Sequence, residues 1–414
     1  MQCTAGCWPV SSRELDSNEP GSKHVNQLAA DSISADTKAR SLVDWAAAFV
    51  PTARERSARC EEQRQILPET IRDLIDAGVS RIAQPVKFGG FGLGVDVVAE
   101  VAMQVGRGCG PTGWMAAQWP AHQFVVGMFK PRAQEEYWAS SPDTLSSTVS
   151  AMGGTFETVN GGLKVNGHFR FSSGIDAAQW IIVVGPSVCL IPKTDFRIED
   201  DWFVAGLRGS GSKGVHIDGA FVPEHRILAP EAVFEGRTFG AQLYNDPYYQ
   251  GIPYTLWASP LLVSAIIGMG QGIVDLFEER VLQRKSMQTM GLAKEQAGNQ
   301  LRFAEATAEV DTARLILRKL FAELREWGQR GGGMPLAERG RVRRDTAYAV
   351  KLCLQAANRL YESGDASAIY DASPSQRLVR DLHAAALHVS LTWDEPAMQF
   401  SRVRWGLPPQ TRLI

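Results

Sequence analysis

The stretch Val165–Gly185, VNGHFRFSSGIDAAQWIIVVG, decides the fold because it places strand-like runs in the middle of a largely helical chain. Polar and apolar side chains alternate in its first part, and four β-branched residues follow one another near its end. The turn signal Asn160-Gly161-Gly162 precedes it, and Asn-Gly between such runs favours a hairpin. We therefore expect an antiparallel β domain at residues 141–235.

Helical periodicity surrounds this β domain on both sides. Before it, Leu67–Val79 begins with a Leu-Pro pair and has a glycine next to its end, as helices often do. After it, helical runs such as Gln296–Trp327 exceed twenty residues and are separated by Gly331–Gly333. Long helices joined by short loops predict a bundle. The predicted domains are a flexible tail at 1–36, a helical domain at 37–140, the β domain at 141–235 and a C-terminal helical bundle at 236–414.

The composition excludes several classes of function. The 414 residues carry 43 Lys and Arg against 45 Asp and Glu, so there is no basic footprint for nucleic acid. The six cysteines are scattered, which favours a reducing cytoplasm over a disulfide scaffold. The most apolar stretch, Trp257–Val274, contains serines, a glutamine and glycines, and we interpret it as a buried core helix. We expect a cytoplasmic protein with no membrane contact.

Glycine-rich and histidine patterns give no nucleotide or metal site. Gly209–Gly214 matches GxGxxG, but a strand pattern follows it where a dinucleotide site needs a helix. The sequence contains no GxxxxGK[ST], HExxH, CxxC or GxSxG. His383 and His388 lie about 140° apart on a helix, so one metal cannot bind both from the same face. We predict no metal, and we interpret His383 as structural.

Four segments resemble one family of enzymes. They are LPETIRDLIDAGVSRIAQPVKFGGFG (67–92), VNGHFRFSSGIDAAQWIIVVG (165–185), GLRGSGSKGVHIDGAFVPEHR (206–226) and QRLVRDLHAAALH (376–388). The chain resembles the flavin-dependent monooxygenases of the acyl-CoA dehydrogenase fold, the oxygenase components of two-component hydroxylases. Members include 4-hydroxyphenylacetate 3-hydroxylase, secosteroid phenol hydroxylase, dibenzothiophene monooxygenase and indole oxygenases. The resemblance implies a mainly α protein with a central antiparallel β domain.

The resemblance also implies an activity. Reduced flavin, FMNH2 or FADH2, would come from a separate NAD(P)H:flavin reductase and bind between the β domain and the bundle. There it would react with O2 to a C4a-hydroperoxide that hydroxylates a small aromatic or heteroaromatic substrate. Such chemistry needs a dry cavity, a hydrogen-bond partner at flavin N5 and a donor for the peroxide oxygens. The family commonly forms tetramers paired through bundle helices, so we expect a homotetramer or a dimer.

Two positions are the main catalytic candidates. Ser172 and Ser173 end a strand before a glycine, which by composition is an ordinary strand end. The resemblance implies that a hydroxyl here meets flavin N5, and it favours Ser172. His388 follows Arg380-Asp381 by about two helical turns and, taken alone, is a histidine on a terminal helix. The resemblance implies that His388 hydrogen-bonds to the peroxide or protonates its departing oxygen.

The remaining candidates have equally plain structural alternatives. His122 is either a packed histidine or, by resemblance, the group that binds or deprotonates the substrate. Trp114 and Trp119 are core residues or pocket walls, with Trp114 at the substrate and Trp119 at the cofactor. Arg284 is a surface ion-pair partner or a ligand of the flavin phosphate, and the same alternatives hold for Arg208.

Three other functions remain as alternatives. An acyl-CoA dehydrogenase needs a carboxylate base, but no Asp or Glu occurs between Asp246 and Asp275, and the second usual place for this base is occupied by the His388 segment. An amine N-hydroxylase on the same fold would use the same flavin chemistry. A catalytically silent scaffold would have no need for Phe171-Ser-Ser-Gly174 and His388 together.

Overall fold

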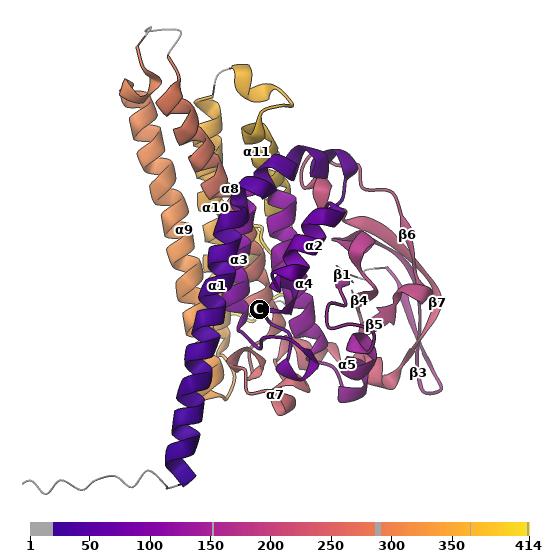
Figure 1. Cartoon of the computed structure of the whole chain (residues 1–414). Helices are drawn as coiled ribbons and strands as arrows, with labels where there is room; N and C mark the ends of the chain where they lie inside the picture. Colours follow the sequence, from indigo (N-terminus) through magenta and orange to yellow (C-terminus); the bar gives the residue numbers. More distant parts are fainter. Residues whose placement is uncertain (1–19, 151–152, 286–290, 365, 412–413) are drawn as a thin grey trace, which may run out of the picture. The chain divides into compact units, whose positions relative to one another are not determined.

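The computed structural model describes residues 20–150, 153–285, 291–364, 366–411 and 414 (Figure 1). Contacts divide the chain into two compact units, one ending at Ser41 and the other comprising Leu42–Ile414. All candidate site residues belong to the second unit. Its order of helices, strands and then helices confirms the predicted fold class.

The helices are α1 (Pro20–Gln63), α2 (Pro68–Asp76), α3 (Val95–Gly108), α4 (Gly110–Val126), α5 (Pro131–Trp138), α6 (Pro230–Phe234), α7 (Gly240–Leu243), α8 (Tyr254–Gln283), α9 (Ala297–Arg330), α10 (Leu336–Glu362), α11 (Pro374–Ala386) and α12 (Asp394–Arg404). The longest helices are α1 in the N-terminal part and α8, α9 and α10 in the C-terminal part. Helix α1 begins at Pro20, so residues 20–36 are helical where the sequence analysis predicted a flexible tail. The fixed φ of proline suits the first position of a helix.

The strands form two four-stranded sheets. They are β1 (Ser146–Ser150), β2 (Thr155–Val159), β3 (Gly162–Ser172), β4 (Trp180–Val184), β5 (Val188–Pro192), β6 (Arg197–Glu199), β7 (Lys213–Pro223) and β8 (Ile227–Leu228). Their orders are β1-β4-β5-β8 and β2-β3-β7-β6. The predicted hairpin joins β2 to β3, where Val159 pairs with Gly162.

One strand pair departs from the antiparallel prediction. Strands β1 and β4 are parallel, with Ser146 opposite Trp180. A parallel pair needs a long connection, and here the connection contains β2 and β3, which belong to the other sheet. The alternation pattern of single strands cannot reveal such pairing. The core of the β domain includes Val165, Phe169, Val215, Ile181 and Ile191.

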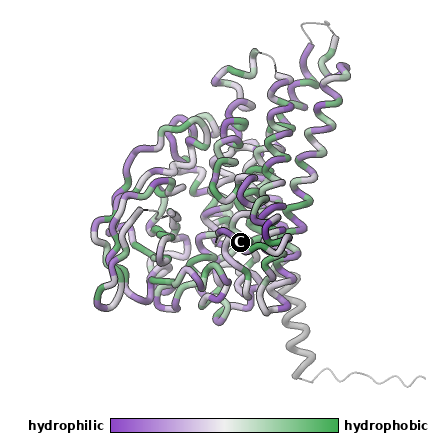
Figure 2. Tube along the Cα trace, turned by 180° about the vertical axis from the view of Figure 1, so that it is seen from behind, coloured by the Kyte–Doolittle hydropathy of each residue, from purple (hydrophilic) through white to green (hydrophobic). Residues whose placement is uncertain are grey.

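Helix α8 is the central helix of the bundle. Its mean hydropathy of 1.6 over 18 residues would suit a membrane span, but 83% of that window is buried inside the protein. Figure 2 shows hydrophobic segments gathered where the helices pack and hydrophilic ones along the outer turns. Helix α8 packs against α3, α4, α9, α10 and α11. This arrangement agrees with the core helix expected from Trp257–Val274.

Helix α4 connects the bundle to the β domain. It packs against α3 and α8 on one side and against β1 on the other (Figure 1). Nearly all of its side chains are buried, including Trp114, Trp119 and His122. Three of the candidate residues therefore lie on a helix that contacts both the sheet and the bundle.

Candidate active site

Strand β3 ends in a buried serine pair. Ser172 is fully buried, and its Oγ has no hydrogen-bond partner within the described residues. Ser173 Oγ, by contrast, bonds to Ser212 Oγ at 2.8 Å and accepts from Trp114 Nε1 at 3.4 Å. A buried hydroxyl without a partner costs free energy. Of the two serines, Ser172 is therefore the one whose hydroxyl would gain a hydrogen bond from a ligand. Its predicted role at flavin N5 stays a prediction.

The backbone just before this pair is strained. Phe171 has a φ of 69°, in the left-handed region that non-glycine residues rarely adopt, and its side chain is exposed. The pairing of β3 with β7 shifts register between Phe169 and Ser172. Such irregularities re-aim side chains at the ends of strands and often occur next to functional sites. Here the register shift and the positive φ of Phe171 occur where the Phe171 side chain is exposed and the next side chain, that of Ser172, is buried.

The rejected GxGxxG segment lies beside the serine pair. Strand β7 begins at Lys213, so no helix follows the segment, in agreement with the rejection of a dinucleotide site. Ser210 and Ser212, which the sequence analysis did not single out, share a hydrogen bond of 2.7 Å. The Ser210 carbonyl accepts from Gly174 N at 2.8 Å. The segment thus supports the backbone on which Ser172 is held.

His122 is buried and has one defined hydrogen bond. Its Nδ1 lies 2.5 Å from the carbonyl oxygen of Ser146 on β1. A carbonyl only accepts, so Nδ1 carries the proton and Nε2 keeps a free lone pair. Burial lowers the pKa of His122 to about 4, although the bond to Ser146 opposes this shift. The ring is therefore a neutral hydrogen-bond acceptor near pH 7.

His388 presents the opposite arrangement. Its Nδ1 lies 3.3 Å from Ser390 N, which donates, and 2.8 Å from Ser390 Oγ. Nδ1 is thus the acceptor, and Nε2 carries the proton. His388 is exposed to solvent in the single chain. The pKa of His388 is lowered to about 4, mainly by desolvation and to a smaller extent by the positive charge of Arg343. This ring is a neutral donor.

Trp114 links the two sides of the site. Its indole donates to Ser173, and its ring centroid lies 5.9 Å from that of His388. The structure therefore brings the end of β3, helix α4 and the segment after α11 together around one tryptophan. Arg343, which the sequence analysis missed, donates to Ser259 Oγ at 2.8 Å and to the Ser390 carbonyl at 3.0 Å. It holds the turn that carries His388 against α8.

Trp119 adds a second buried polar atom without a partner. Its Nε1 has no hydrogen-bond acceptor within the described part of the chain. A Cβ on Gly174 would lie only 2.9 Å from this nitrogen and would also collide with Met115 Cε. Two unpaired polar atoms, on Ser172 and Trp119, therefore lie in the neighbourhood of one glycine. A ligand edge with both a donor and an acceptor, such as that of a flavin ring, fits this pair.

Gly174→Ala tests how tightly this region is packed. We expect it to lower the free energy of unfolding by about 2–5 kcal/mol, because a positive φ and a collision add together. Gly161→Ala is the matched control, since Gly161 also has a positive φ but a Cβ there would meet no atom within 4 Å. It should cost only about 1–2 kcal/mol. Urea unfolding of both variants measures the difference, and equal losses would contradict the packing described here.

Two other predicted residues lie elsewhere. Arg284 follows the end of α8, 25 residues after Ser259 and therefore roughly 37 Å along the helix axis. Within one chain it is not brought together with the other candidates, and its role as a phosphate ligand stays a prediction. His383 lies 2.8 Å from Asn358 Oδ1 through its Nε2 and is exposed, which agrees with a structural residue.

A cavity lined by residues of α1 and α11 is separate from these candidates. It has a volume of about 1200 Å³ and is open to solvent. Charged side chains of α1 and α11 line it, together with Arg208, whose Nε is buried without a partner. None of the predicted catalytic residues lines this cavity.

Asp381 fixes the segment that leads to the serines. Its Oδ1 accepts from Leu207 N at 2.6 Å, across 174 residues of sequence. Burial raises the pKa of this carboxyl to about 7. Leu207 begins the turn that continues to Ser210, so α11 positions both His388 and the support of Ser172.

Comparison with known proteins identifies the family. The oxygenase subunit HsaA of a flavin-dependent monooxygenase from Rhodococcus jostii (strain RHA1) is 31% identical over 372 residues, which cover 87% of this chain and 97% of that protein. The chain belongs to the flavin-dependent monooxygenase oxygenase subunits. Residues 261–393 also match the family described as acyl-CoA dehydrogenase, C-terminal domain.

Further relatives of this oxygenase subunit agree with its fold and class. The oxygenase component of p-hydroxyphenylacetate 3-hydroxylase from Acinetobacter baumannii is 28% identical, with 92% of each chain covered. The crystal structure of the HsaA monooxygenase from M. tuberculosis superposes with a TM-score of 0.85 at 30% identity, covering 91% of this chain and 100% of that one. The enzyme is thus a flavin-dependent monooxygenase, as the sequence predicted. The alternatives of a dehydrogenase, an N-hydroxylase and a silent scaffold gain no support.

Proposed function

We propose that this oxygenase subunit hydroxylates a phenol or a closely related small aromatic molecule. The observation that carries the proposal is the opposite polarity of two neutral imidazoles: His122 offers a lone pair at Nε2, and His388 offers a proton at Nε2. Relatives named for p-hydroxyphenylacetate and resorcinol hydroxylation support a phenolic substrate. Either FMNH2 or FADH2 is the proposed flavin.

His122 is suited to bind the substrate hydroxyl. A neutral Nε2 accepts a hydrogen bond from the phenolic O–H, which raises the electron density of the aromatic ring, and it takes up the proton as the hydroxyl becomes more acidic during oxygen transfer. The Nδ1 bond to Ser146 fixes the orientation of the ring, since the two groups are only 2.5 Å apart. Trp114 is proposed as a wall of the substrate pocket because this α4 side chain lies beside His388, with ring centroids 5.9 Å apart.

Ser172, Ser173, Trp119 and His388 are proposed to surround the flavin. Reduced flavin, when bound, would supply the two electrons that activate O2, one atom of which is inserted into the substrate while the other leaves as water. The Ser172 hydroxyl is the proposed partner of N5, and Trp119 Nε1 donates to a second polar atom of the ring edge. His388 donates through Nε2 to the oxygen atoms as charge develops on them. The buried walls of α4 exclude water from this region.

The test is a single-turnover experiment with the purified subunit. Chemically reduced FMN or FAD is mixed with O2 and a panel of phenols and indoles, and the product is analysed after use of ¹⁸O2. We expect one ¹⁸O atom in a hydroxylated phenol. Product from an indole alone would contradict the phenolic assignment, and reduction of bound oxidised flavin by an acyl-CoA would overturn the monooxygenase chemistry.

His122→Ala should separate substrate activation from the reaction with oxygen. We expect phenol hydroxylation to slow by roughly 10²- to 10⁴-fold, the usual contribution of a general base, while flavin oxidation by O2 continues. Rapid-quench product analysis and flavin absorbance measure the two steps. His383→Ala is the control, because this imidazole is exposed and contacts Asn358. Equal hydroxylation rates in wild type and His122→Ala would contradict the assigned role.

The assembly and location of the enzyme are further parts of this proposal. A homotetramer paired through bundle helices is supported by exposed apolar residues on α9, namely Leu301 and Leu315. A cytoplasmic location is supported by four unpaired cysteines among the described residues. We retain the domain boundaries at residues 141 and 236 as part of this proposal, whereas α1 continues across residue 37.

A further inference from the structure

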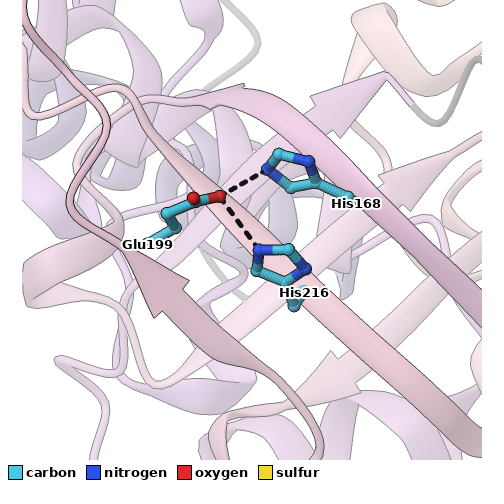
Figure 3. A group of neighbouring side chains, drawn as sticks. All are labelled: His168, Glu199 and His216. Carbon is cyan, nitrogen blue, oxygen red and sulfur yellow. Dashed lines mark hydrogen bonds and ion pairs between the residues drawn. The ribbon is translucent and has the colours of Figure 1, made fainter.

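Two histidines and a glutamate meet on one face of the sheet β2-β3-β7-β6 (Figure 3). His168 on β3 lies directly opposite His216 on β7. Glu199 on β6 is paired with Gly214, two residues before His216 on the same strand. Side chains two residues apart share a face, so Glu199 and His216 point to the same side. That face is the outer one, because the neighbouring residues Phe169 and Val215 point into the core.

The three side chains converge on one point. Glu199 Oε2 lies 2.7 Å from His168 Nε2 and 2.9 Å from His216 Nε2. The two imidazole rings are stacked, with centroids 4.1 Å apart and planes inclined by 6°. Figure 3 shows both rings directing a nitrogen towards the same carboxylate oxygen. A single oxygen thus faces two imidazole nitrogens, and all three ligand atoms lie within 4.8 Å of one another.

Gly214 makes room for this arrangement. A Cβ at this position would lie 3.0 Å from His168 Nε2 and 2.9 Å from Asp201 Oδ2. Asp201 is held there because its Oδ1 accepts from Gly214 N at 2.7 Å. Asp201 also lies 3.9 Å from Arg170 Nε, so it offsets part of the positive charge near the histidines. A second carboxylate therefore borders the cluster.

We propose that His168, Glu199 and His216 bind a divalent transition-metal ion of the zinc type. Two imidazoles and one carboxylate are a donor set that zinc accepts, with the remaining position open to water. Bonds of about 2.0–2.1 Å in a tetrahedral site place ligand atoms roughly 3.3 Å apart. The distances from Glu199 Oε2 to the two Nε2 atoms are now 2.7 and 2.9 Å. Small side-chain rotations that move these atoms apart by about half an ångström would reach the tetrahedral value.

The site has a structural consequence and no sequence signature. Its ligands come from three adjacent strands, so a bound ion would cross-link β3, β7 and β6. The ligands are 31 and 48 residues apart from His168, which is why no short metal-binding pattern revealed them. Arg197, opposite His216, adds a positive charge that weakens cation binding. Because the cluster lies on the outer face of the sheet and Arg197 weakens cation binding, we expect the metal ion to bind reversibly.

Metal titration of the full-length chain tests the proposal. After treatment with a chelator, Zn²⁺ is titrated in competition with a chromophoric chelator, and Co²⁺ is added separately to record its visible absorption. We expect wild type to bind one more equivalent than His216→Ala, Glu199→Gln or His168→Ala, or to bind it roughly tenfold more tightly. We also expect a visible Co²⁺ spectrum with imidazole ligands only in wild type, and a Zn²⁺-dependent rise in Tm that the variants lack.

His225→Ala is the matched control. His225 Nε2 lies 2.9 Å from Glu136, which also binds Arg226, so this carboxylate is shared with a guanidinium and offers no comparable site. The control should bind Zn²⁺ as wild type does. Circular dichroism verifies that each variant is folded, and the three ligand variants give independent results. Equal Zn²⁺ binding by wild type and the ligand variants, or none by wild type, would overturn the proposal in favour of a metal-free His–Glu–His hydrogen-bond cluster.

Discussion

His388→Ala is expected to uncouple flavin oxidation from hydroxylation. The variant should oxidise reduced flavin at a rate close to that of wild type, but product formed per flavin should fall by roughly 10²-fold, with H2O2 formed in its place. Removal of one preorganised donor to a developing negative charge typically costs 10²–10³ in rate. Product yield and peroxide yield are measured in the same single-turnover reaction.

The physical reason lies in the protonation of the ring. Ser390 N donates to Nδ1, so His388 offers its proton at Nε2, and the ring is neutral because its pKa is lowered to about 4. The folded protein therefore disfavours the protonated ring, and coupling should stay constant from about pH 6 to 8. Below about pH 4 the ring gains a proton, and Nδ1 becomes a donor that can no longer accept from Ser390 N.

Two further variants make this result specific. His388→Gln retains an N–H donor and should recover part of the coupling, which a purely structural role for His388 would not predict. His383→Ala, at an exposed histidine on α11, should couple like wild type. An unchanged product yield per flavin in His388→Ala would refute the role assigned to this residue.

Local patterns in the sequence predicted most of the elements, and the family resemblance supplied the candidate residues, but neither predicted the contacts between them. Leu67–Val79 predicted α2 because its proline and glycine mark both ends within one short segment. The hydrogen bond between His122 and Ser146 depends on the position of β1. Strand β1 pairs in parallel with β4, and the chain between them forms β2 and β3 of the other sheet. No periodicity encodes that path.

Long-range pairs of residues were equally invisible in the sequence. The 174 residues between Leu207 and Asp381 carry no local sign that the two will bond. The sequence analysis rejected Gly209–Gly214 as a nucleotide site for a correct reason, the strand that follows it. It missed that Ser210 and Ser212 in this segment support Ser173, because a hydroxyl's partner depends on tertiary structure alone.

Asp381→Ala is expected to lower the free energy of unfolding by about 2–4 kcal/mol at pH 5. The carboxyl is buried and accepts from Leu207 N at 2.6 Å. Alanine would leave this backbone N–H buried without an acceptor, which costs about 1–3 kcal/mol, and would remove packing atoms as well. Leu207 also has a φ of 53°, a conformation that costs a non-glycine residue roughly 1–2 kcal/mol. Asp381 thus holds a strained turn in place.

Asp381→Asn separates the hydrogen bond from the charge. Asparagine keeps an acceptor for Leu207, so the loss at pH 5 should stay within about 1 kcal/mol. The pKa of Asp381 is raised from 3.8 to about 7, so the folded state binds the proton more tightly than the unfolded state. Its contribution to stability is complete below about pH 4 and is lost as the pH rises to 7, by roughly 4 kcal/mol in all. Asp381→Asn should remove this decline and be more stable than wild type at pH 8.

Urea unfolding at pH 5 and pH 8 compares the three proteins, and the same samples can be titrated with reduced flavin under anaerobic conditions. Because the Leu207 turn leads to Ser210, whose carbonyl accepts from Gly174 beside Ser172, a loosened turn should weaken flavin binding in Asp381→Ala and leave it unchanged in Asp381→Asn. If Asp381→Asn keeps the pH dependence of wild type, another group titrates. If Asp381→Ala binds flavin as tightly as wild type, this carboxyl stabilises the fold without positioning the site.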